Sequence, residues 1–161
     1  MQINRFSLVL KLLLVLALLV ACQSDGRLMA FASQGCANYA ASIYAGDVSL
    51  APESNAAPAS NWCDCCIEHD IAYWRGGTSQ QHDQADARLR DCVARKTSDQ
   101  ALANQLYQDL RSGGSAYFFD GYRWAYGWSD ERQYRALEQH ELLIANRLLL
   151  DYFKAGQQIC L

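Results

Sequence analysis

The stretch CDCCIEHDIAYW, residues 63–74, decides the fold of this chain. It places three cysteines within four residues, and His69 and Asp70 follow side by side. As part of a helix predicted over 61–74, Cys65, His69 and Tyr73 recur at i, i+4 and i+8 and share one face. Asp70 lies about 100° round the same helix. The stretch therefore predicts a helix that presents a histidine and a tyrosine on one side and an aspartate on another.

A second helix follows after the short break at 75–77. Thr78 and Gln81 form a capping-box pattern that opens a helix running to about residue 95. The short connection predicts that this helix returns antiparallel beside the first. Asp86, Leu89 and Val93 then form one stripe, with Cys92 on its flank. The facing sides of the two helices can hold a histidine, a tyrosine and a buried aspartate together.

These residue types suit a hydrolytic site. A histidine whose ring nitrogen contacts a buried carboxylate is fixed in tautomer, is made more basic and can act as a general base on water. Asp70 points elsewhere, and a carboxylate with backbone carbonyls from a loop is the ligand set that Ca²⁺ prefers. The alternative interpretation of His69 is a structural histidine with satisfied hydrogen bonds.

The N-terminus resembles an export signal that ends in the lipobox of bacterial lipoproteins. Arg5 and Lys11 precede a short apolar run, 12–20, and Leu19-Val20-Ala21-Cys22 follows the lipobox pattern. An ordinary secretory signal with a coincidental cysteine is the alternative. The resemblance implies that Cys22 is acylated and anchors the protein to a membrane without spanning it. Gln23 rather than aspartate after the cysteine implies the periplasmic face of the outer membrane.

We expect a signal at 1–21, a tether at 22–33 and one helical domain at 34–161, acting as a monomer. Loss of the signal would remove Arg5 and Lys11 and no acidic residue, so the formal charge of −3 becomes −5. This balance does not suit nucleic-acid binding.

Apart from Cys22, six of the seven cysteines remain in an exported chain, which favours three disulfides. Spacing alone does not choose among their pairings. A zinc site at 63–69 is the alternative, but adjacent cysteines on a helix diverge too far to ligate one ion.

The rest of the chain predicts further helices. We expect a short helix at 33–45, a loop at 46–60, a helix capped by Ser98, an aromatic non-helical stretch at 116–128, and a long helix from Ser129 to about Gly156. The third helix has an apolar stripe of Leu102, Leu106 and Leu110, and the last has an apolar face of Tyr134, Leu137, Ile144, Leu148 and Tyr152.

Residues 65–73 resemble the active-site helix of secreted phospholipase A2, whose pattern is Cys-Cys-x-x-His-Asp-x-Cys-Tyr. A second element also matches, because Cys92 follows Asp86 by six residues, as in that family. Ala72 and Ala85 stand where the family has two cysteines that bond to each other, so one whole bridge is missing. The resemblance implies a mainly α, disulfide-braced fold with two long antiparallel active-site helices.

The resemblance also implies one pairing and several roles. Cys65 would bond to Cys92; we then expect Cys66 to reach back to Cys36, which leaves Cys63 with Cys160. His69 would activate water for hydrolysis of the sn-2 ester of a glycerophospholipid, with Asp86 and Tyr73 orienting its ring and Ca²⁺ on Asp70. The family's glycine-rich calcium loop would correspond to 46–62, where no such signature is visible. That departure motivates the alternative of a non-catalytic envelope module with the same fold.

Three further groups of residues remain. His82 and His140 lie among polar neighbours, and we expect both to be solvated. Glu68 is expected to be an exposed neighbour of the site. The alternating Tyr122, Trp124, Tyr126 and Trp128 either pack against the helices or form a lipid-facing rim.

Overall fold

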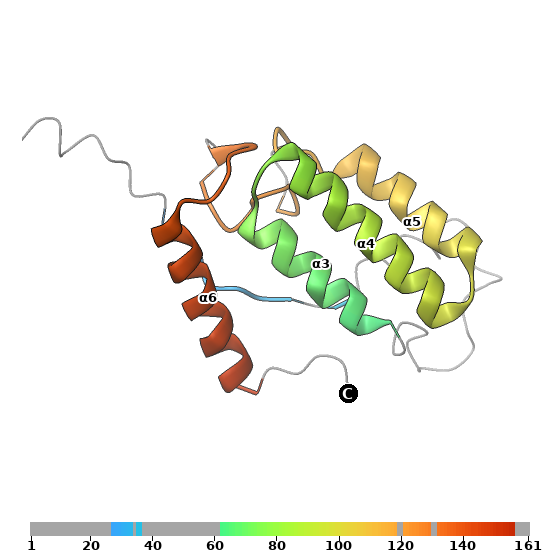
Figure 1. Cartoon of the computed structure of the whole chain (residues 1–161), viewed down its shortest axis with the longest axis horizontal. Coiled ribbons are helices and arrows are strands. Elements are labelled where there is room, and N and C mark those ends of the chain that lie inside the picture. Colours follow the sequence, from blue (N-terminus) through green and yellow to red (C-terminus); the bar gives the residue numbers. More distant parts are fainter. Residues whose placement is uncertain (1–26, 34, 37–61, 119–120, 130–131, 157–161) are drawn as a thin grey trace, which may run out of the picture.

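The protein is described by a computed structural model that covers residues 27–33, 35–36, 62–118, 121–129 and 132–156. Within these ranges it is mainly helical, as predicted, and contains no strand. The helices are α3 (Cys63–Arg75), α4 (Ser79–Thr97), α5 (Gln100–Gly113) and α6 (Gln139–Lys154). Figure 1 shows α4 between α3 and α5, and α6 on the other side of α3. No helix of the described residues is both long and apolar enough to cross a membrane.

Several predictions lie outside the described residues: the signal at 1–21 with Cys22, most of the helix at 33–45, the loop at 46–60, and Cys160. Where 33–45 is described, at residues 33, 35 and 36, it is not helical.

Two of the three expected disulfides are present. Cys65 bonds to Cys92 and braces α3 against α4, and Cys36 bonds to Cys66 and ties the N-terminal segment to α3. Cys63 is also disulfide-bonded. The Cys65–Cys92 bridge joins residues 27 apart in sequence and stabilises the helix pair by about 3 kcal/mol in the chain-entropy picture.

The turn between α4 and α5 corrects one predicted helix start. The capping box of Thr78 and Gln81 opens α4 as predicted. Ser98, however, ends α4 in a left-handed conformation with φ 59°, and Asp99 caps α5 by accepting a hydrogen bond from the backbone of Leu102. An aspartate in extended backbone is as good an N-cap as serine, so a Ser-Asp pair does not decide the boundary by itself.

The aromatic stretch covers the C-terminal end of α3, where backbone carbonyls have no partner within the helix. The backbone N–H of Ala125 donates to the carbonyl of Tyr73 at 2.7 Å. The indole of Trp128 donates to the carbonyl of Arg75 at 2.8 Å, and that of Trp124 to Gly77 at 3.0 Å. The stretch therefore packs against the helices, and Trp124 and Trp128 are buried in the core rather than exposed on a rim.

The last helix begins ten residues later than predicted, at Gln139, with a capping box between Glu138 and Glu141. Arg132 forms a bidentate, buried ion pair with Glu141 of α6. This pair holds the segment before the helix against α6, so that segment does not continue the helix. Tyr134 turns inward instead of lying on a helix face. The predicted apolar face is wrong at Ile144, which is 46% exposed, and the buried face consists of Glu141, Ala145, Leu149 and Tyr152.

The segment 27–33, expected to be part of a tether, is packed into the core along Leu28 and Phe31. The Phe31 ring contacts Trp74 of α3 and Tyr152 of α6, with ring centroids 5.4 and 4.7 Å apart. This segment therefore packs between α6 and α3 and, as Figure 1 shows, runs close to α3.

Candidate functional site

The antiparallel helix pair brings three of the predicted site residues into direct contact. Nε2 of His69 lies 3.0 Å from Oδ1 of Asp86, and the Tyr73 hydroxyl donates to the same oxygen at 2.8 Å. His69 is 2% exposed, Asp86 and Tyr73 not at all. The contact follows from the helical repeat. Cys65 and His69 lie one turn apart on α3, and their partners Cys92 and Asp86 lie six residues apart on the antiparallel α4.

Burial decides the protonation of this pair. Burial lowers the pKa of His69 below its usual value, and the hydrogen bond that His69 donates to Asp86 only partly opposes it. The predicted rise in basicity is therefore wrong in its net direction. Burial alone would raise the pKa of Asp86, but hydrogen bonds from His69 and Arg111 hold it below its usual range. At neutral pH the pair is an imidazole that donates from Nε2 to a carboxylate, and Nδ1 is the basic nitrogen.

Three residues that the sequence did not assign to the site complete the surroundings of Asp86. Arg111 of α5 donates to Oδ2 of Asp86 at 2.8 Å. His82, expected to be solvated, is 3% exposed, and its Nε2 lies 2.8 Å from the Tyr73 hydroxyl. The Tyr134 hydroxyl lies 3.1 Å from Nδ1 of His82. The i, i+4 spacing of His82 and Asp86 on α4 was the one sequence signal that could have found His82.

Gly114 leaves the room that the Tyr73 hydroxyl needs. A Cβ at residue 114 would lie 2.1 Å from that oxygen, whereas a Cβ at Gly113 would meet nothing within 4 Å. We expect Gly114→Ala to push Tyr73 off Asp86 and to lower the free energy of unfolding by about 2 kcal/mol. Urea unfolding measures this loss. Gly113→Ala is the matched control and should be neutral or slightly stabilising; equal effects of the two variants would contradict the packing argument.

Asp70 lies on a separate part of α3, as predicted, and is 1% exposed. Its Oδ2 accepts from the Ser33 hydroxyl at 2.5 Å, and its Oδ1 accepts from the Tyr122 hydroxyl. The described chain offers it no cationic side chain, and burial raises its pKa to about 7. Ser33 belongs to the N-terminal segment that the Cys36–Cys66 disulfide ties to α3. Residues 46–61, where the resemblance would place the calcium loop, lie outside the described residues.

The raised pKa of Asp70 makes stability depend on pH. Between about pH 4 and pH 7 the unfolded chain loses this proton and the folded protein keeps it, so stability falls as pH rises. We expect Asp70→Asn to remove that fall. The free energy of unfolding of the variant minus that of the wild type should be a few kcal/mol larger at pH 8 than at pH 5. Urea unfolding in the presence of a chelator measures this difference.

The wild-type curve alone would not isolate Asp70. His69 and His82 have lowered pKa values, so they destabilise the fold as pH falls below about 6.5, which opposes the trend. Because both proteins carry these histidines, the difference between them at each pH reports Asp70. A difference that does not change between pH 5 and pH 8 would show that the carboxylate titrates normally.

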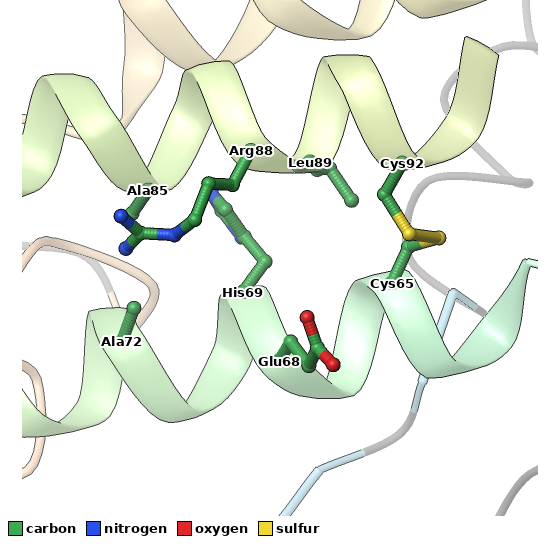
Figure 2. Close-up of a pocket in the computed structure, with 8 residues that line it drawn as sticks. All are labelled: Cys65, Glu68, His69, Ala72, Ala85, Arg88, Leu89 and Cys92. Atoms are coloured by element: carbon green, nitrogen blue, oxygen red, sulfur yellow. A yellow bond between two sulfur atoms is a disulfide. The ribbon is translucent and has the colours of Figure 1, made fainter. Parts of the chain in front are cut away.

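A recess of about 20 Å³ reaches His69 between α3 and α4, with room for about one water molecule. Figure 2 shows His69 pointing from α3 toward α4, with the Cys65–Cys92 disulfide at one end of the recess and Ala72 and Ala85 at the other. Glu68, Arg88 and Leu89 complete the lining, and Glu68 is exposed, as expected. The two alanines therefore leave a water-sized opening beside the histidine.

The remaining predicted residues are less informative. His140 is exposed, as expected. Tyr122 and Tyr126 are half-buried and stack with ring centroids 5.8 Å apart. No group of three or more metal-ligating side chains occurs among the described residues, and Cys65 and Cys66 are disulfide-bonded.

Comparison of the chain with protein-family models, with curated protein sequences and with solved structures finds no match.

Proposed function

We propose that this protein is a phospholipase A2-like hydrolase that cleaves the sn-2 ester of glycerophospholipids in a calcium-dependent reaction. One observation carries the proposal: a fully buried carboxylate, Asp86 of α4, holds the His69 imidazole at 3.0 Å. A second buried carboxylate, Asp70, directly follows His69 in α3. Water-mediated ester hydrolysis needs a base with a fixed tautomer and a carboxylate that can hold a cation, and none of the described residues supplies Asp70 with a cationic side chain.

The protein's own residues supply the proton transfer. Nδ1 of His69 takes a proton from water as the water oxygen bonds to the ester carbonyl carbon. The imidazolium then gives the proton to the leaving glycerol oxygen when the carbon–oxygen bond breaks, so that fatty acid and lysophospholipid leave. Asp86 and Tyr73 keep Nε2 protonated and the ring fixed throughout. No nucleophilic side chain is consumed.

The residues around Asp70 fit a calcium ion chemically. A buried carboxylate with no cationic partner in the described chain is stabilised by a hard cation, and the Ser33 hydroxyl beside it is a further oxygen ligand of the kind that Ca²⁺ takes. Asp70 would hold the ion, and the Ser33 and Tyr122 hydroxyls would move off its oxygens. When bound, Ca²⁺ would supply positive charge to the phosphate and to the ester oxygen.

The proposed place of action is a membrane surface. The lipobox pattern at Leu19–Cys22 supports an exported protein anchored by acyl chains on Cys22, on the periplasmic face of the outer membrane. The recess of about 20 Å³ beside His69 has room for the attacking water but not for an acyl chain.

The test is an assay of the purified protein, with its disulfides intact, on mixed phospholipid vesicles. We expect release of fatty acid and lysophospholipid in calcium, and none in a chelator. A protein with intact disulfides and a cooperative unfolding transition that releases no fatty acid in calcium would refute the proposal.

The second candidate function is a non-catalytic envelope module. It is favoured by the fact that both oxygens of Asp70 already accept hydrogen bonds from the chain. Calcium binding separates the candidates without an activity assay, because a ligand of the native state raises its melting temperature. The hydrolase predicts a rise in millimolar calcium that Asp70→Asn abolishes; the module predicts no rise in either protein.

A further inference from the structure

His82 is a buried histidine outside the proposed proton-transfer pair. It lies one turn before Asp86 on α4 and is 3% exposed. Its ring is enclosed by Tyr73, Trp124 and Tyr134, with centroid separations of 4.9 to 5.6 Å. A histidine buried this deeply needs a partner for each ring nitrogen, and its partners determine where its proton sits.

The contacts of Nε2 require a proton on that nitrogen. Nε2 lies 2.8 Å from the Tyr73 hydroxyl and 3.5 Å from Oδ2 of Asp86. Tyr73 has a single hydroxyl proton and donates it to Oδ1 of Asp86, because a carboxylate is the stronger acceptor. The Tyr73 oxygen can then only accept from His82, so Nε2 is the donor.

The contacts of Nδ1 exclude a proton on the other nitrogen. Nη1 of Arg111 lies 3.4 Å from Nδ1, and a guanidinium can donate but cannot accept. The Tyr134 hydroxyl, 3.1 Å away, is placed to donate to the same nitrogen. A protonated Nδ1 would set its N–H against that of Arg111. His82 is therefore the neutral Nε2–H tautomer.

From this arrangement we propose that His82 is a positioning residue that acts on His69 through Tyr73 and Asp86. Its Nε2–H donates to the Tyr73 oxygen, which makes the Tyr73 hydroxyl a stronger and better-directed donor to Asp86. Asp86 accepts from both that hydroxyl and His69, so His82 tunes how strongly the carboxylate accepts from Nε2 of His69 and how it holds that ring. The catalytic consequence rests on the proposed function, but the effect on His69 does not.

Nitrogen NMR of the imidazoles tests the tautomer directly in the purified wild-type protein. We expect His82 to show a protonated Nε2 and an unprotonated Nδ1 at pH 7. A protonated Nδ1, or an imidazolium, would overturn the proposal whether or not the protein hydrolyses lipid.

Two substitutions test the action on His69. The amide of His82→Gln can still donate to Tyr73, whereas His82→Leu cannot donate. Among the described residues, the charged or titratable groups facing this network are Asp83 and Asp86 and Arg88 of α4, Arg111 of α5, Tyr73 of α3, and Tyr134. All remain in both variants. With a weaker Tyr73 donor, Asp86 accepts more strongly from Nε2 of His69, so His82→Leu should shift the Nε2 proton resonance of His69 downfield. His82→Gln should leave that resonance near its wild-type position.

Kinetics give a second readout. We expect His82→Leu to lower kcat about tenfold with little change in KM, and His82→Gln to restore it. If the Nε2 proton resonance of His69 is the same in all three proteins, His82 is structural only and the proposal is wrong. If the wild type is inactive but that resonance responds as expected, the proposed function fails and the positioning role stands.

Discussion

Replacing Asp86 with alanine should lower the free energy of unfolding by about 4 kcal/mol. The carboxylate is fully buried and accepts hydrogen bonds from His69, Tyr73 and Arg111. Its removal leaves two buried donors, the His69 ring and the Tyr73 hydroxyl, without this acceptor. It also opens a cavity between α3 and α4. Urea unfolding at pH 7, with the disulfides intact, measures the loss.

Asp83 provides the matched control for that substitution. It lies three residues earlier on α4, is more than half exposed, and pairs with the same guanidinium of Arg111 at 2.8 Å. A surface ion pair contributes at most about 1 kcal/mol, so Asp83→Ala should change stability little. Similar losses in the two variants would mean that the charge on Arg111, rather than the buried hydrogen bonds of Asp86, carries the stability.

His69→Gln should reduce calcium-dependent fatty-acid release about a thousandfold if the proposed function holds. The glutamine amide can still donate to Asp86, so the hydrogen bond of the pair is kept while the basic nitrogen is lost. Initial rates on phospholipid vesicles measure the loss, and a melting temperature within a few degrees of the wild type would show that the fold survives.

His140→Gln is the control for the loss of a histidine, because His140 is exposed on α6 and should leave the rate unchanged. A His69→Gln protein that retains a tenth or more of the wild-type rate would exclude His69 as the general base. The same result would leave the structural role of Asp86 intact, because that role depends only on the hydrogen bonds around the carboxylate.

The pairing of α3 with α4 was predictable in detail. The i, i+4 repeat of Cys65, His69 and Tyr73, the capping box at Thr78 and the short turn between the helices are all local patterns. Together they place Asp86 opposite His69 before any tertiary contact is known. The disulfide between Cys65 and Cys92, 27 residues apart, was predicted from the resemblance and is present in the structure.

Two predictions that the structure contradicts, one in the site and one in the last helix, share one cause. His82 was expected to be solvated because its neighbours in sequence are polar, yet Trp124 from a distant loop covers it with a centroid separation of 4.9 Å. The last helix was expected from Ser129, but the buried pair of Arg132 with Glu141 and the inward turn of Tyr134 prevent it. Contacts made by loops from far along the chain outweighed local preference at both places.

The sequence by itself determined the two helices and the faces on which His69 and Asp86 lie, because helical geometry relates residues a few turns apart in one helix without reference to the rest of the chain. The bond between Cys65 and Cys92 was implied by the resemblance and not by that geometry. Only the tertiary structure decided that Arg111 and Tyr134 join this network and that Ser33 covers Asp70. Those contacts depend on the paths of intervening segments and on which polar groups become buried, and no local repeat in the chain records either.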